Sequence, residues 1–345
     1  MTASTPLEAI DLADVSIADV VTVARDETPV EVTSAVLTRV EQTRAAIEAL
    51  AASPNPTYGV STGFGALATV SIPPERRAAL QVSLIRSHAA GSGAGVERDV
   101  VRAMMLLRLR TLATGRTGVR PVVVETLAAM LNAGLTPVVR EHGSLGCSGD
   151  LAPLAHVALA ATGEGSVVDR DGSVRPAADA LRDAGIAPLT LAEKEGLALI
   201  NGTDGMTGML CLVLADLAEL LPIADITTAM TVEALLGTDR VFAADLQALR
   251  PHPGQALSAG NLRRLLAHSP IMDSHRNDKT HIVQDAYSLR CAPQVTGAAR
   301  DALDYAMGVA DRELHSAIDN PVVTLDGRVE SNGNFHGAPV AYVLD

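Results

Sequence analysis

The chain has 345 residues, of which 48% are hydrophobic, so it can bury a large core, and its length allows one to three domains. The net charge of −13 argues against a nucleic acid or an anionic membrane surface as a partner. Alanine and leucine dominate the sequence and favour helices, which predicts a mainly α fold.

The cysteines and the N-terminus indicate the compartment. Three cysteines are an odd number without paired spacing, so they form no disulfide framework. Residues 1–5 lack the basic segment that precedes the apolar part of a secretory leader. We therefore expect a cytoplasmic protein. Among the few aromatic side chains, four lie in glycine-rich or polar stretches and are site candidates: Tyr58, Phe64, Tyr287 and Phe335.

The N-terminal part predicts a short strand, a helix and a loop. The strand is expected near Val15. A helix follows Pro29, and its apolar face consists of Val36, Val40, Ile47 and Ala51. Residues 53–56 contain two prolines and end it. The stretch from Tyr58 to Gly65 has too many glycines for a helix or a strand interior, and it predicts a mobile loop that carries one phenol.

The next helix is predicted to begin at Pro73-Pro74 and to stop at Gly91. Its Leu80, Leu84 and His88 recur every four residues, so His88 lies in the last turn on the core-facing stripe. There it either interacts with the negative helix end or belongs to a site. Residues 91–95 are glycine-rich, but they follow a helix and not a strand, which excludes a dinucleotide-binding loop. Two more helices are predicted over residues 97–113 and 121–133.

Residues 143–150, with the sequence GSLGCSGD, predict a tight loop that leads into a helix ending near Thr162. One interpretation is a helix-capping loop. The other is chemical: in a tightly bent loop, the amide nitrogen of Gly149 attacks the carbonyl carbon of Cys147 and closes a five-membered ring. Loss of one water there, and of the Ser148 hydroxyl as a second water, leaves an electrophilic methylene. A serine-hydrolase elbow is excluded because Asp150 occupies the position of its last glycine.

The middle of the chain predicts a hairpin and long helices. Residues 167–174 predict the hairpin, with an Asp-Gly turn. Asn201 follows an apolar run and by itself indicates a helix cap. The apolar region 205–237 is interrupted by acids and a proline, which predicts a buried helix pair and not a membrane span. Histidines gather between residues 250 and 282, but their spacing matches no zinc pattern, so no metal is expected.

The last part predicts a polar face, a helix and a second hairpin. Gln284, Tyr287 and Arg290 share a face if their stretch is helical, which displays an amide, a phenol and a guanidinium together. From the residues alone, this face is either a surface polar stripe or a place where arginine holds a carboxylate. A helix is predicted over residues 296–318 and a hairpin over 322–329.

The runs at residues 58–65, 143–156, 283–294 and 331–337, together with Asn201, resemble the histidine and phenylalanine ammonia-lyase family. The resemblance implies a self-made cofactor, 4-methylidene-imidazol-5-one (MIO), formed from Cys147, Ser148 and Gly149. Most members have alanine at the first of these positions, and some actinobacterial members share the cysteine. Ring closure uses only the carbonyl group of that residue.

The resemblance also implies roles for the other candidate residues. Tyr58 would remove the proton from the β-carbon of the substrate, and His88 would select its side chain. Asn201 would contact the substrate amine and the cofactor ring. Arg290 would hold the substrate carboxylate.

Three more residues complete the implied site. Tyr287, counted among the catalytic residues, and Gln284 would line the cofactor ring. Phe335, in the polar run 331–337, would lie near the cofactor.

The implied fold is mainly α and fumarase/aspartase-like, with a long-helix core, an N-terminal loop-rich α domain and short β-hairpins. We place the domains at residues 1–203, which carry the electrophile loop, and 204–345, a helical core expected to be truncated at its C-terminus relative to the family. The expected activity is elimination of ammonia from L-histidine to give trans-urocanate, by a homotetramer. The alternatives are a tyrosine or phenylalanine ammonia-lyase or aminomutase, and a non-catalytic fragment that keeps the assembly scaffold.

Overall fold

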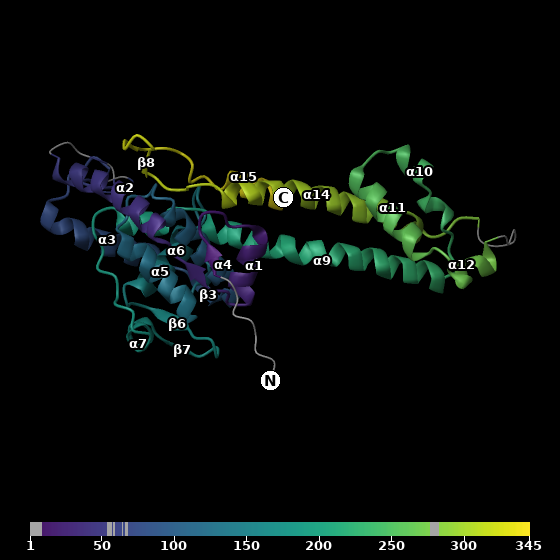
Figure 1. Cartoon of the computed structure of the whole chain (residues 1–345), viewed down its shortest axis with the longest axis horizontal. Coiled ribbons are helices and arrows are strands. Elements are labelled where there is room, and N and C mark those ends of the chain that lie inside the picture. Colours follow the sequence, from purple (N-terminus) through teal and green to yellow (C-terminus); the bar gives the residue numbers. More distant parts are fainter. Residues whose placement is uncertain (1–8, 54–56, 58, 64, 66–67, 277–282) are drawn as a thin grey trace. The chain divides into compact units, whose positions relative to one another are not determined.

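The computed structural model describes residues 9–53, 57, 59–63, 65, 68–276 and 283–345 (Figure 1). The chain divides into two compact units, residues 1–212 with 310–343 and 345, and residues 213–309 with 344. The division falls within two long helices, α9 (Asp204–Ala234) and α14 (Ala292–Leu314). The predicted domain boundary after residue 203 stays a prediction.

The first unit consists of helices and short strands. Besides parts of α9 and α14, its helices are α1 (Ile17–Arg25), α2 (Ser34–Ala52), α3 (Pro74–His88), α4 (Arg98–Ala113), α5 (Pro121–Ala133), α6 (Leu151–Ala161), α7 (Ala177–Asp183), α8 (Glu195–Ile200) and most of α15 (Ala338–Leu344). Its strands are β1 (Ile10–Asp11), β2 (Val30–Glu31), β3 (Ser92–Gly95), β4 (Thr136–Pro137), β5 (Arg140–His142), β6 (Ser166–Val168), β7 (Val174–Pro176), β8 (Val322–Val323) and β9 (Val329–Glu330).

Helix α4 is enclosed by other helices of the first unit and packs against α1, α2 and α5 (Figure 1). Every residue from 101 to 113 is buried, as expected for a helix enclosed by others. Its arginines therefore need internal partners. Arg102 donates to the carbonyl groups of Val23 and Leu131, and Arg108 forms a buried ion pair with Asp204 at 2.6 Å.

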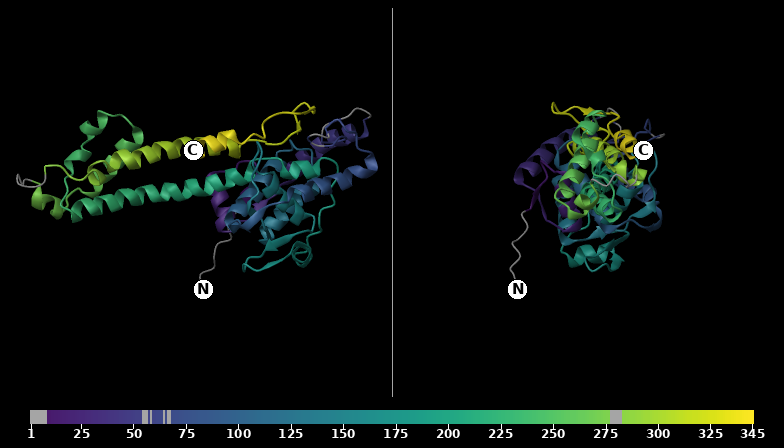
Figure 2. Two further views of the ribbon diagram at one scale, coloured as in Figure 1. Left: turned by 180° about the vertical axis from the view of Figure 1, so that it is seen from behind. Right: turned by 90° about the vertical axis from the view of Figure 1, so that its right-hand side faces the viewer.

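The strands form small sheets at the edges of this core. β1 and β2 are parallel, whereas β3–β5, β4–β6–β7 and β8–β9 are antiparallel. Helix α7 packs on β6 and β7 (Figure 2). The predicted hairpins over 167–174 and 322–329 are both present as β6–β7 and β8–β9. The glycine-rich residues 92–95 form β3, whose partner is β5.

One N-terminal prediction was wrong. The strand expected near Val15 is instead the approach to α1, and the strand of this region is β1. Ser16 and Asp19 form a capping box, in which the serine hydroxyl accepts the Asp19 N–H and the aspartate accepts the Ser16 N–H. This local pair starts a helix where the apolar residues alone resembled a strand.

The second unit is helical in its described residues. It contains most of α9 and α14, with a 3-10 turn (Arg240–Phe242), α10 (Ala244–Ala248), α11 (Pro253–Leu265), α12 (Pro270–His275) and α13 (Tyr287–Arg290). Its core is formed by Ala229, Val232, Phe242, Ala259, Leu262, Leu266, Met272 and Leu289. Asp225 is buried beside this core and accepts hydrogen bonds from Ser258, Asn261 and Arg300.

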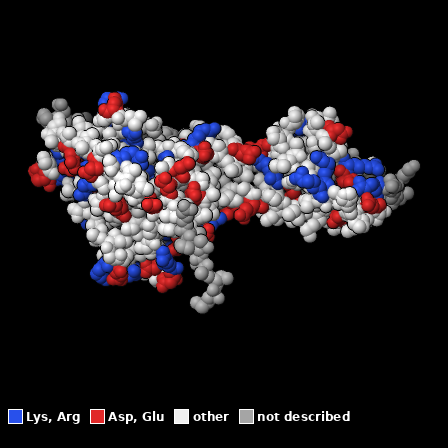
Figure 3. All heavy atoms as spheres, in the orientation of Figure 1, with Lys and Arg blue, Asp and Glu red and all other residues white. Residues whose placement is uncertain are grey.

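The predicted helix pair over residues 205–237 is also wrong, because α9 is one helix of 31 residues that continues through Pro222. It is not buried all round. Within the second unit, apolar side chains are exposed along it: Val213, Leu217, Leu220, Ile223, Ile226 and Met230. Among the described residues, no helix is long and apolar enough to cross a membrane. The cytoplasmic location stays a prediction. On the face drawn in Figure 3, acidic and basic side chains are intermixed.

Candidate active site

The loop at residues 143–150 bends back on itself. Gly146 and Gly149 have φ angles of +77° and +86°, a region that favours glycine. Leu145 and Gly149 form an isolated antiparallel bridge. Between them Cys147 is exposed at the surface, while Ser148 keeps only 3% of its surface. The loop therefore brings its ends together around the Cys-Ser-Gly triplet.

Asp150 connects this loop to another helix. It occupies the cap position of α6 but makes no side-chain cap there. Instead its Oδ2 accepts the N–H groups of Gly205 and Met206 at 2.7 and 3.0 Å, at the start of α9. Burial, reinforced by the negative charge of Asp204, raises the pKa of Asp150 to about 7, although the two N–H groups lower it.

A third segment, just before α15, holds the loop from another side. The main-chain N–H of Gly337 donates to the carbonyl oxygen of Cys147 at 2.7 Å. Gly337 is buried, and a Cβ atom on it would lie 2.8 Å from Met206 Sδ and 3.2 Å from the Ser148 carbonyl oxygen. Only glycine fits this contact without movement of its neighbours.

A cavity of about 360 Å³ opens beside the loop, entirely within the first unit. Five of the predicted site residues line it together with Asn320: His88, Cys147, Ser148, Asn201 and Phe335. The remaining wall is mostly apolar and consists of Gly65, Leu84, Gly146, Leu151, Leu197 and Ile200. Polar groups at a few points of an otherwise apolar cavity are typical of a small-molecule site.

His88 is held in a defined orientation at the end of α3. Its Nδ1 lies 2.9 Å from the Leu84 carbonyl oxygen and 3.0 Å from the Ser87 hydroxyl. A carbonyl oxygen can only accept, so Nδ1 carries the proton in the neutral ring. The other nitrogen, Nε2, is then the hydrogen-bond acceptor of this side chain.

Asn201 is oriented by a residue that the sequence did not single out. Its Nδ2 donates to the carbonyl oxygen of Asn320 at 3.2 Å, which leaves Oδ1 as an acceptor. Asn320 is itself fixed, because its Oδ1 accepts the Ser331 hydroxyl and the Asn332 N–H. The sequence carries no local signal for this contact, because Asn201 and Asn320 are 119 residues apart.

Of the other predicted site residues that the structure describes, none is in this cavity wall, although Gly149 directly follows Ser148. Tyr58 lies outside the described residues, as does Phe64. Gln284, Tyr287 and Arg290 belong to the second unit. Helix α13 begins at Tyr287, so Gln284 precedes the helix and the condition for a helical face shared by the three residues is not met.

Tyr287 and Arg290 nevertheless lie together. The guanidinium carbon of Arg290 is 4.4 Å from the centre of the Tyr287 ring, which is a cation–π contact. The Tyr287 side chain is 72% exposed. The Nε atom of Arg290 is buried and has no hydrogen-bond partner among the described residues.

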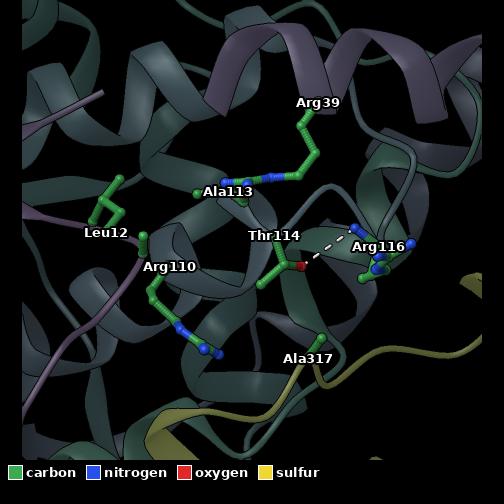
Figure 4. A pocket seen from close by; sticks show the side chains of 8 residues that line it. Leu12, Arg39, Arg110, Ala113, Thr114, Arg116 and Ala317 are labelled. Carbon is green, nitrogen blue, oxygen red and sulfur yellow. Dashed lines mark hydrogen bonds between the residues drawn. The ribbon is translucent and has the colours of Figure 1, made fainter. Parts of the chain in front are cut away.

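A second cavity in the first unit, of about 300 Å³, is lined by three arginines (Figure 4). Two of them donate hydrogen bonds to the main chain: Arg39 donates to the Ala113 carbonyl oxygen, and Arg110 donates to that of Ser316. Thr114 accepts the Arg116 N–H through its hydroxyl, as the dashed line in Figure 4 shows. These contacts satisfy main-chain carbonyl groups of Ala113 and Ser316. In the described parts of the chain, no cluster of His, Cys, Asp or Glu could hold a metal ion.

The chain belongs to the aromatic amino acid lyase family, whose model matches residues 15–345. Among its relatives, the histidine ammonia-lyase of Streptomyces griseus is 62% identical over 327 residues, covering 95% of this chain and 63% of that protein. The tyrosine ammonia-lyase of Cupriavidus metallidurans is 46% identical over 342 residues, covering 94% of this chain and 64% of that protein.

Solved structures agree with this assignment. The tyrosine aminomutase of Streptomyces globisporus matches with a TM-score of 0.88 at 37% identity, over 98% of this chain and 67% of that one. The histidine ammonia-lyase of Trypanosoma cruzi matches with a TM-score of 0.85 at 35% identity, over 97% and 62%. The predicted mainly α lyase fold is confirmed. The chain spans less than two thirds of the length of the histidine ammonia-lyases of three Streptomyces species, 63% to 65%.

Proposed function

We propose that this chain provides the substrate pocket of a histidine ammonia-lyase, which eliminates ammonia from L-histidine to give trans-urocanate. The observation that carries the proposal is the cavity that unites Ser148, His88 and Asn201. The 62% identity to a protein named histidine ammonia-lyase supports the choice of substrate.

We propose MIO, formed from Cys147, Ser148 and Gly149, as the cofactor. Two features of the loop fit it. The Leu145–Gly149 bridge and the φ of +86° at Gly149 bend the chain tightly at the triplet, which supports the attack of the Gly149 nitrogen on the Cys147 carbonyl carbon. When present, this group supplies an electrophilic methylidene carbon that captures an amine and makes it a better leaving group.

His88 selects the substrate side chain in this proposal. With Nδ1–H used by the Leu84 carbonyl, Nε2 is an acceptor for the N–H of a substrate imidazole. A benzene ring offers no such donor, and a pocket acceptor left without a partner loses affinity. A phenylalanine substrate is therefore less suited to this pocket, whereas the phenol O–H of tyrosine is a donor that His88 alone does not reject.

Asn201 and Phe335 position the substrate from the other walls. The Oδ1 acceptor of Asn201 suits the amino group of an amino acid, because its Nδ2 is occupied by Asn320. Phe335 lines the cavity and supplies an apolar wall beside the loop. Both side chains restrict the orientations in which the substrate reaches Ser148.

We propose Arg290 as the ligand of the substrate carboxylate and Tyr58 as the base that takes the β-proton. The unpartnered Nε of Arg290 supports the first role, since a guanidinium fork matches both carboxylate oxygens. Tyr287 orients that guanidinium by their ring contact, and Gln284 adds an amide nearby in sequence.

A homotetramer is part of the same proposal. The exposed apolar side chains of α9, from Val213 to Met230, form a long stripe that a monomer leaves in water. Packing of this stripe against the same helix of other copies would bury it.

The function is tested by incubating the purified chain separately with L-histidine, L-tyrosine and L-phenylalanine and recording the ultraviolet absorbance of the conjugated products. We expect urocanate from histidine, and none from a Ser148→Ala variant. Cinnamate or coumarate formed in preference to urocanate would reassign the substrate. Intact mass spectrometry gives a second readout, because the mature chain should lack the mass of two waters that the variant keeps. Turnover retained in the variant would remove Ser148 from the mechanism.

A further inference from the structure

In the proposed ring closure, the Gly149 nitrogen attacks the carbonyl carbon of Cys147. The oxygen of that carbonyl group already accepts a hydrogen bond in this structure. Gly337 N–H donates to the carbonyl oxygen of Cys147 at 2.7 Å, across 190 residues of sequence. We propose that this N–H is the oxyanion donor for formation of the cofactor ring, an inference that rests on the proposed function.

The chemistry explains why a donor is needed at this atom. When the nitrogen of Gly149 bonds to the carbonyl carbon of Cys147, the C=O electron pair moves onto the oxygen. That oxygen takes the Gly149 proton and then leaves as water with the Ser148 N–H proton, which creates a C=N bond to the nitrogen of Ser148. The second water consists of the Ser148 hydroxyl and its Cα proton, and a C=C bond remains. No oxidant or reductant is consumed.

The amide carbonyl is a weak electrophile, so negative charge on its oxygen is the costly part of the first step. A donor aimed at that oxygen before reaction stabilises the charge as it develops. Each such preorganised N–H in other enzymes contributes about a hundredfold to a thousandfold in rate. Gly337 N–H has the position and the length of contact that this role requires.

The surroundings of Gly337 keep its N–H in place. Its carbonyl oxygen accepts the N–H groups of Val340 and Ala341, the first turn of α15, while its own N–H lies outside the helix hydrogen bonds. Its missing side chain lets the backbone approach Met206 Sδ and the Ser148 carbonyl, which a Cβ atom would meet at 2.8 and 3.2 Å. The Ser148 carbonyl is the one that the ring retains, so Gly337 lies directly against the reacting residues.

A matched set of variants distinguishes the effect of the Gly337 N–H from the effect of the limited room for a side chain at position 337. Met206→Ala removes the sulfur atom that crowds a side chain at position 337. In that background, Gly337→Ala keeps the N–H, whereas Gly337→Pro removes it at a φ of −79° that proline accepts. In the otherwise unchanged chain, replacement of Gly337 by glycolic acid puts an ester oxygen in place of the N–H at almost constant shape.

The readout is the rate at which each full chain loses the mass of two waters after cell-free synthesis, followed by intact mass spectrometry. Circular dichroism and thermal melting of the same samples report folding. We expect Met206→Ala, with or without Gly337→Ala, to cyclise at nearly the wild-type rate. The proline and ester chains should cyclise at least about tenfold more slowly while melting normally.

Each outcome decides the inference. A folded ester chain that cyclises as fast as the wild type overturns the role of Gly337 and leaves the proposed function intact. If the Gly337→Pro chain does not fold, the chain with glycolic acid at position 337 provides the test. A wild-type chain that loses no water at all overturns the proposed cofactor, and the inference with it.

Discussion

Asp150 Oδ2 accepts the Gly205 N–H at 2.7 Å, so the acid that follows the Cys-Ser-Gly triplet caps the start of α9 and not that of its own helix α6. The carboxyl is 4% exposed, and its second N–H partner is that of Met206. A buried carboxyl group that is costly to ionise thus joins the loop at residues 143–150 to α9.

This burial predicts a pH-dependent contribution to stability. The folded chain keeps a proton on Asp150 up to a pKa of about 7, whereas the unfolded chain releases it near 3.8. The stabilising contribution is therefore complete below about pH 4 and is lost as the pH rises through 7. The unfolding free energy of the wild type relative to Asp150→Asn should fall by up to about 4 kcal/mol over this range. Urea titrations at several pH values measure it.

An exposed acid provides the control for this measurement. The Ser173 N–H lowers the pKa of Asp171, so Asp171→Asn should give a small change of the opposite sign. A difference between the wild type and Asp150→Asn that stays constant from about pH 4 to 7 would contradict the prediction.

Helices with strong local signals were predictable from the sequence. Pro74 and Pro121 stand at the first positions of α3 and α5, and Gly134 adopts a left-handed φ of +77° at the end of α5, as expected for a C-cap. The long α9 was not predictable in the same way, because a helix interior with Pro222 resembles the junction of two helices.

The candidate site was only partly accessible to sequence reasoning. The GSLGCSGD loop has an unusual composition, so Ser148 could be singled out locally. The contacts that orient the pocket join distant segments: Asn201 reaches Asn320, and Gly337 reaches Cys147. No periodicity or spacing encodes such pairs, and glycine at position 337 carries no functional atom beyond its backbone. The roles of the predicted site residues stay predictions.

Substrate choice should change at His88. His88→Phe removes the Nε2 acceptor and leaves the imidazole N–H of the substrate unpaired, so kcat/KM for histidine should fall about tenfold to a hundredfold. The same change should raise the rate with phenylalanine, whose ring prefers an apolar wall. Initial rates with both amino acids measure the ratio. His88→Gln, which keeps a polar group, should shift the ratio less, and an unchanged ratio in His88→Phe would remove this residue from substrate selection.

The ion pair of Lys194 and Asp319 should stabilise the segment that holds Asn201. Both side chains are completely buried, and Asp319 also accepts the N–H of Asn320. Burial lowers the pKa of Lys194, while Asp319 opposes that effect. Lys194→Met leaves a buried carboxylate unpaired and should cost about 3–5 kcal/mol of unfolding free energy.

Two comparisons make the ion-pair prediction specific. Adding Asp319→Asn to Lys194→Met should recover part of the loss, because the charge is removed and the acceptor for Asn320 N–H is kept. Arg86→Met breaks the exposed pair with Glu164 and should cost less than about 1 kcal/mol. Equal losses for the buried and exposed pairs in urea unfolding would count against the argument.

Two helical glycines in the second unit should respond to alanine with opposite signs. Gly297 in α14 lies against α11, where a Cβ atom would be 2.3 Å from the Gln255 nitrogen and 2.7 Å from the Gly254 carbonyl carbon. At Gly260 in α11, the nearest atom of the described residues would lie 3.6 Å from such a Cβ. Gly260→Ala should therefore stabilise the chain by up to about 1 kcal/mol through helix propensity.

Gly297→Ala gains the same helix propensity, but its Cβ atom can fit only if the backbones of α11 and α14 move apart. Backbone moves less easily than a side chain, so the variant should lose about 1–3 kcal/mol or more of unfolding free energy. Thermal and urea unfolding of the two single variants give the comparison. Because the substitution and the helical setting are the same, the difference between them reports only the close approach of α11 and α14. If Gly297→Ala were as stable as Gly260→Ala, the two helices would not be in backbone contact at this position.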